Sequence, residues 1–112
     1  MKGRLEYYDH NDEFRKLLPV TGWATPAPPP SDSTHRWFIV ELDAALVYQG
    51  YTCRQLLIAS RWKDVEVGDR VPAAVFVLLV PATTTVARGW SVRAFPHAAW
   101  GRWHVVDTAN RD

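Results

Sequence analysis

The stretch VPAAVFVLLV, residues 71–80, decides the expected fold. From Ala73 onward every residue in it is apolar, so we expect neither face of the segment to contact water. A buried helix and a central β-strand both fit such a run. Pro72 and Pro81, together with the β-branched residues between them, favour the strand. We therefore predict a strand over residues 71–80 that other elements cover on both faces.

Four further segments, all rich in β-branched and aromatic residues, are predicted to be strands. They comprise residues 36–47, 52–60, 89–95 and 102–107. In the first of them apolar and polar residues alternate, which is typical of a half-buried strand. Its expected inward face consists of Phe38, Val40, Leu42, Ala44 and Leu46. Gly68 and Asp69 supply turn residues before the apolar run. Short strands separated by turns predict an all-β fold, a small closed antiparallel β-barrel.

The N-terminal part of the chain has a different character. Residues 11–18, NDEFRKLL, begin with an Asn that suits a helix cap and end before Pro19, which predicts one or two helical turns. Residues 25–34, TPAPPPSDST, combine prolines with small polar residues and are interpreted as a semi-rigid linker. We therefore expect a partly disordered or short-helical segment with a Pro-rich linker over residues 1–35, and the barrel domain over residues 36–112.

Composition limits the classes of function. The chain has 112 residues, 47% of them hydrophobic and 22% charged, as in an ordinary globular domain. Its formal net charge of +1 lacks the basic excess that drives binding to phosphate backbones, so a nucleic-acid partner would need a local patch. The N-terminal sequence has no apolar stretch like that of a signal peptide, and no run is long enough to span a membrane. With a single cysteine, Cys53, these features predict a cytoplasmic protein that does not bind membranes.

One part of the sequence resembles a known family. VGDRVPAAVFVLLVP, residues 67–81, followed by Gly89, resembles the C-terminal β-barrel domain of elongation factor Tu, in which a turn leads into a long apolar strand. Gly50 and Tyr51 resemble the Gly-Tyr segment of that family, and residues 100–106 resemble its closing strand. The resemblance implies a barrel that contacts structured RNA or a protein of the translation machinery.

Departures from the family pattern affect its partner surfaces. Val67 replaces the turn proline, Thr52 stands where the family has Arg, and Trp103 stands where a closing-strand glycine is usual. The chain also lacks a GxxxxGK[ST] phosphate loop, so we expect no nucleotide cofactor and no GTPase activity. The resemblance therefore implies the barrel, whereas the partner does not follow from it.

Enzymatic chemistry has only scattered candidates. Cys53 with His97 or His104 as base, and Asp107 to orient the base, would form a thiol-dependent hydrolase. However, Cys53 lies within an expected strand, where a small buried apolar residue is the usual interpretation. The four histidines show no HxxxH or HExxH spacing, which argues against a metal site. We therefore expect no catalytic residues, no metal and no other cofactor.

The most promising functional feature is a run of aromatic and cationic residues near the C-terminus. Such side chains are enriched where proteins contact one another, and they also stack on bases. The predicted binding residues are Tyr51, Arg54, Trp90, Arg93, Trp100, Arg102 and Trp103. The alternative is that the tryptophans of this run pack inside the barrel. The sequence thus predicts a non-enzymatic binding module for a protein or structured RNA, with an inhibitor or immunity protein and a Cys-dependent hydrolase as alternatives.

Overall fold

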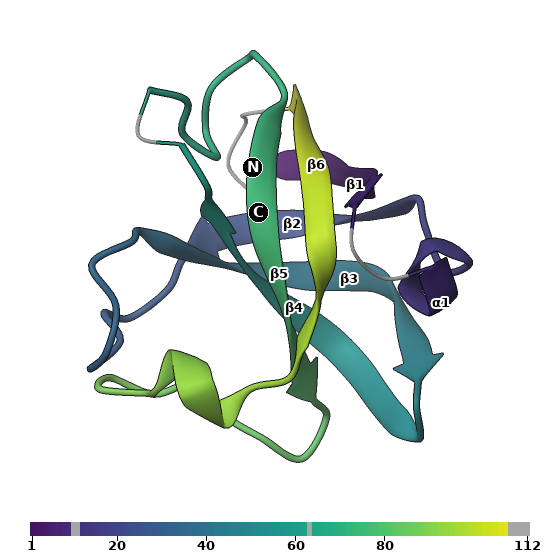
Figure 1. Ribbon diagram of the computed structural model, residues 1–112, viewed down its shortest axis with the longest axis vertical. Coiled ribbons are helices and arrows are strands. Elements are labelled where there is room, and N and C mark those ends of the chain that lie inside the picture. Colours follow the sequence, from purple (N-terminus) through teal and green to yellow (C-terminus); the bar gives the residue numbers. More distant parts are fainter. Residues whose placement is uncertain (10–11, 63, 108–112) are drawn as a thin grey trace.

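Six antiparallel strands, each paired with the next along the chain, close into a barrel because the last strand also pairs with the first (Figure 1). The computed structural model describes residues 1–9, 12–62 and 64–107. The strands are β1 (Lys2–Asp9), β2 (Val20–Pro26), β3 (Trp37–Tyr48), β4 (Tyr51–Ser60), β5 (Ala73–Pro81) and β6 (His97–Asp107). A short helix α1 (Asp12–Arg15) and a 3-10 turn η1 (Val92–Ala94) complete the described elements. The predicted closed antiparallel β-barrel is confirmed.

The N-terminal part of the chain differs from expectation, because β1 and β2 are strands of the barrel. They lie between β6 and β3 in the closed sheet, so the barrel begins well before residue 36. Without them, β3 and β6 would each present an unpaired edge. Both strands were missed because glycines interrupt their apolar pattern and Pro26 ends the second. Of the expected helix over residues 11–18, α1 is present, whereas Asn11 lies outside the described residues.

The interior core is organised around Trp103 of β6, the largest fully buried side chain. Its indole ring lies directly over Gly3 of β1, where a Cβ atom would overlap the ring. In the same way Leu5 of β1 packs against Gly101 of β6. Large and small side chains therefore alternate across the β1–β6 pair, which fills the narrow interior without a clash. Phe14 of α1 is fully buried at one end of the barrel. Its ring packs edge to face against the ring of Tyr48, with the two ring centres 5.4 Å apart.

A second core covers the outer face of β3, β4 and β5. Its centre is Trp90, whose ring makes T-shaped contacts at 5.7 Å with both Trp37 and Phe95. This layer confirms that the apolar run is covered on both faces from Ala73 to Val80, whereas Val71 and Pro72 at its start are exposed. The expected strand over residues 89–95 is wrong, because this segment forms a turn and η1 that pack onto the sheet from outside.

The proline-rich segment is bound to the barrel and is no free spacer. The indole N–H of Trp90 donates to the carbonyl of Pro28 at 2.6 Å, and the Ser31 N–H donates to the Trp90 carbonyl at 2.7 Å. The Asp32 carboxylate accepts hydrogen bonds from the Ser91 hydroxyl and from the backbone N–H groups of residues 92 and 93. Prolines cannot donate backbone hydrogen bonds but their carbonyls accept them, so this segment can cover the second core without a strand partner.

The remaining predicted strands agree closely with the structure. Residues 36–47, 52–60 and 71–80 correspond to β3, β4 and β5 with small shifts at their ends, and residues 102–107 form the second half of β6. The expected turn at Gly68 and Asp69 is also present, since the Asp69 N–H donates to the Glu66 carbonyl at 3.0 Å. In Figure 1, β5 and β6 cross in front of β2 and β3, which run in a different direction.

The contact between Trp103 and Gly3 predicts a sharp difference between two glycines. Gly3→Ala should lower the free energy of unfolding by about 1–3 kcal/mol, because the new methyl group overpacks the core against a ring that cannot move. Gly68→Ala is the matched control, since the nearest atom to its new Cβ is the Met1 Cε at 3.7 Å, an ordinary contact. Urea unfolding followed by tryptophan fluorescence measures both, and equal stability of the two variants would contradict this packing.

The Asp32 hydrogen bonds predict a dependence on pH. The backbone N–H of Val92, followed by the Ser91 hydroxyl, holds the pKa of Asp32 below its ordinary value of 3.8. A carboxyl whose pKa is lower in the folded state stabilises the fold above its unfolded pKa, and this contribution is lost as the pH falls. The stability difference between the wild type and Asp32→Ala should therefore be largest near neutral pH and shrink from about pH 5 towards pH 2. Urea unfolding at several pH values measures the stability of both proteins. A stability difference that stays constant between pH 5 and pH 2 would contradict the stabilising role of the Asp32 carboxylate.

Candidate binding surface

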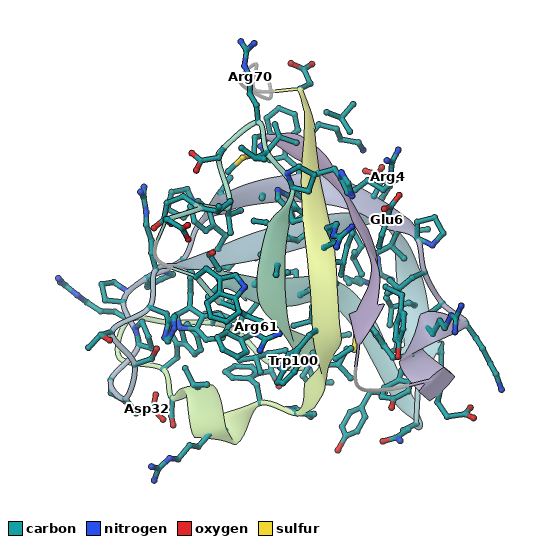
Figure 2. All side chains as sticks on the ribbon, turned by 45° about the horizontal axis from the view of Figure 1, so that its top comes forward. Arg4, Glu6, Asp32, Arg61, Arg70 and Trp100 are labelled. Atoms are coloured by element: carbon teal, nitrogen blue, oxygen red, sulfur yellow. The ribbon has the colours of Figure 1, made fainter. Side chains whose placement is uncertain are left out.

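The outer surface of the barrel carries a cluster of aromatic rings around one arginine, which we call the aromatic–arginine surface. It consists of His35, Arg61, Trp62, Phe76 and Trp100. The guanidinium carbon of Arg61 lies 3.6 Å from the ring centre of Trp100, 5.3 Å from that of Trp62 and 6.0 Å from that of Phe76. Figure 2 shows Arg61 and Trp100 next to each other. Such stacking keeps the guanidinium in place while its N–H groups remain available at the edge of the plane.

The strands fix the positions of these side chains. Phe76 on β5 and Trp100 on β6 are directly paired residues, so their rings share the outer face. Arg61 directly follows β4, and its backbone N–H donates to the Ala74 carbonyl at 2.8 Å. The hydroxyl of Ser60, which is largely buried, lies within hydrogen-bonding distance of the backbone carbonyls of residues 62 and 65 and accepts from the Trp62 N–H at 3.3 Å, and so holds the turn that carries Trp62. The surface is therefore built largely on ordered backbone.

Trp62 is the most informative residue of this surface. Its side chain is 57% exposed, although an indole gains much free energy when it leaves water. Beside it lies a groove of about 410 Å³ that Arg36, Ser60 and Glu66 also line. An exposed tryptophan next to a stacked arginine and a groove is typical of a contact point for another molecule.

The seven predicted binding residues do not form one surface. Trp100 and Arg102 lie on the outer face of β6, Trp100 within the aromatic–arginine surface. Trp90 and Trp103 are only 7% and 1% exposed, so both belong to the cores.

The other three predicted residues lie elsewhere. Exposed Tyr51 and Arg54 lie near the start of β4, and Arg54 lines a separate groove of about 400 Å³. Arg54 and Arg61 are seven positions apart in the sequence, which spans about 23 Å at the usual rise of a strand. Arg93 belongs to η1, which covers the second core.

Sequence reasoning missed Arg61 and Trp62. They lie in the segment SRWKD between two strong strands, where polar residues and charges are typical of a turn. The signal was present, because a tryptophan in a polar turn has few neighbours to bury it. The stacking of Arg61 on Trp100 could not be anticipated, since these residues lie far apart in the sequence and meet only because β5 brings β4 and β6 together.

Charges on the outer faces of β1 and β6 are partly compensated. The Glu6 carboxylate lies 2.9 Å from the Arg4 Nε (Figure 2). Its other oxygen lies 2.9 Å from the His104 Nε2. Glu6 is also directly paired in register with Arg102 on β6. Acidic and basic groups thus alternate on this face, which does not resemble the continuous cationic stripe that nucleic-acid backbones require.

The candidate thiol chemistry lacks a base near the sulfur among the described side chains. Cys53 is completely buried inside the barrel, and this burial raises the pKa of its thiol. His104 lies on the outer face of β6 and contacts Glu6, with β5 between its strand and that of Cys53. The side chain of His97 lies outside the described residues. Within residues 1–9, 12–62 and 64–107, no cluster of three His, Cys, Asp or Glu residues could hold a metal ion.

Comparisons with protein-family models, with curated proteins and with solved structures find no match to this chain. In the part of the chain that the structure describes, no helix is long and apolar enough to cross a membrane. The candidate surface therefore rests on its own geometry.

The burial of Cys53 predicts its reactivity. In the folded protein a thiol reagent such as iodoacetamide should modify Cys53 far more slowly than a free cysteine at neutral pH, because the thiolate is disfavoured and the reagent has no access. The same reagent should modify it readily once guanidinium chloride has unfolded the chain. Mass spectrometry measures both rates. Rapid modification of Cys53 in the folded protein would contradict its burial and would favour the hypothesis of a thiol-dependent hydrolase.

Proposed function

We propose that this protein is a non-enzymatic binding module that holds a protein partner on the aromatic–arginine surface. The observation that carries the proposal is the exposed indole of Trp62 next to Arg61, which is itself stacked on Trp100. Tryptophan and arginine are the residue types most enriched among those that dominate binding energy at protein interfaces. A rigid barrel that presents them on short turns loses little conformational entropy when a partner binds.

Mixed charges at the surface favour a protein over structured RNA as the partner. Affinity for RNA depends on several cations arranged along the bound phosphates, whereas the groove beside Trp62 combines Arg36 and Arg61 with the carboxylate of Glu66. The resemblance to the elongation factor Tu barrel would favour RNA or a translation protein, and no comparison supports it. An inhibitor or immunity protein, which acts by contact alone, is one form that such a binding module takes.

The proposal is tested by capture from a lysate of the source cells with the purified, immobilised protein. Trp62→Ala should reduce the bound partner at least tenfold, a loss of about 1.4 kcal/mol that is modest for a central tryptophan. Val47→Ala is the control, because Val47 is similarly exposed, at 62%, and lies on β3 outside the aromatic–arginine surface.

Ribonuclease and salt distinguish the two partner classes. A protein partner should remain bound after ribonuclease treatment and show only a weak dependence on salt, because aromatic burial dominates the contact. Loss of the captured material with ribonuclease, together with a steep decrease at high salt, would replace the protein partner with RNA. Equal capture by wild type and Trp62→Ala would overturn the proposed surface.

A further inference from the structure

An apolar pocket of about 390 Å³ adjoins the aromatic–arginine surface. Trp37, Phe76, Leu78 and Phe95 form its apolar lining, and His35 and Arg93 also border it. His35 and Phe76 belong to the aromatic–arginine surface as well, and their rings meet edge to face at 5.4 Å. The pocket and the surface are therefore continuous, and one bound segment of chain can reach both.

The structure largely fixes the shape of this pocket in advance. Trp37 and Phe95 both pack against Trp90, and the Trp37 indole N–H donates to the Ser33 hydroxyl at 3.1 Å. On the opposite side, the Asp32 carboxylate holds the backbone of η1 through the N–H groups of Val92 and Arg93. A pocket whose lining is already ordered binds an apolar group at a low cost in conformational entropy.

The charges at the rim select the kind of segment that fits. Among the described residues, Asp32 is the only carboxylate that lines the pocket, and it already accepts three hydrogen bonds from residues 91–93. The exposed side chain of Arg93 borders the same pocket, and Arg36 and Arg61 line the adjoining groove together with Glu66. Because three guanidinium groups and two carboxylates line the pocket and the groove, and one of the carboxylates is already hydrogen-bonded, an occupant with carboxylates on either side of an apolar group is favoured over a basic one.

We infer that this pocket is the specificity subsite of the binding module and takes a leucine or phenylalanine side chain from an acidic segment of the partner. The inference rests on the proposed function, because it describes how the partner engages the same surface. The apolar side chain enters the pocket over Phe76 and Leu78. The flanking carboxylates bind Arg93 on one side and the arginines of the adjoining groove on the other.

The test is a titration of the ¹⁵N-labelled full-length protein, followed by NMR, with three blocked seven-residue peptides. The first carries one leucine between aspartates, the second replaces the aspartates with lysines, and the third replaces the leucine with alanine. The first should shift the Trp37 indole N–H and the backbone amides of residues 92–95, with a dissociation constant of about 1 mM or tighter. The other two peptides should bind at least tenfold more weakly.

Two matched variants examine the role of the rim. Arg93→Gln should weaken binding of the aspartate-leucine peptide several-fold, and Arg88→Gln, an exposed arginine of the same loop that does not line the pocket, should leave it unchanged. An unchanged Trp37 indole signal in the free variants shows that the pocket is intact. Absence of shifts with the first peptide, equal binding of the lysine peptide, or no effect of Arg93→Gln would overturn the inference.

These outcomes are distinct from those that test the proposed function. If Trp62→Ala abolishes capture of the partner while the peptides do not bind, the binding surface stands and the acidic, apolar segment is wrong. If the aspartate-leucine peptide binds as described while Trp62→Ala leaves capture unchanged, the apolar pocket is supported as a binding site. The proposed role of the aromatic–arginine surface is then contradicted.

Discussion

The contact between the Trp103 indole and Gly3 is the constraint on which the barrel depends. A sheet closes only where its first and last strands pair, and here the closing strands also have to accommodate the largest buried side chain of the interior. Gly3 leaves the space that the ring needs, and Gly101 leaves the corresponding space for Leu5. A side chain on either glycine would overpack the interior between β1 and β6 and weaken the pairing that closes the barrel.

Closure of the interior has a consequence for the outside. Because the second half of β4 and most of β5 are apolar on both faces, their outer side chains need a second cover. The proline-rich segment and the loop that carries Trp90 provide it, and they hold one another through the contacts of Asp32 and Pro28. The edges of this cover create the pocket and the groove next to Trp62. The candidate binding surface thus lies where the second core ends and the outer face of the strands is no longer covered by loops.

The tryptophans show how far sequence reasoning reaches. Residues 100 and 103 are three apart on one strand, so a period of two places them on opposite faces, and that much follows from the sequence. Which of the two faces inward did not follow, because both neighbourhoods contain small residues and arginines. Trp90 was expected on a strand and lies instead in an external layer. The prediction of an aromatic and cationic contact surface therefore named Trp100 and missed Trp62, which the surface leaves 57% exposed.

The sequence by itself determined the all-β class, the strands β3, β4 and β5, and the burial of residues 73–80 on both faces, because these depend on local pattern and on how apolar each run is. Only the tertiary structure decided that β1 and β2 belong to the barrel, since their weak local signals are outweighed by the free energy gained when two exposed edges are paired. It also decided where Arg61 meets Trp100 and which tryptophan remains in water. The polar turn around Trp62 hinted at its exposure, whereas the stacking of Arg61 on Trp100 depends on a contact between residues far apart in the chain, which no local pattern encodes.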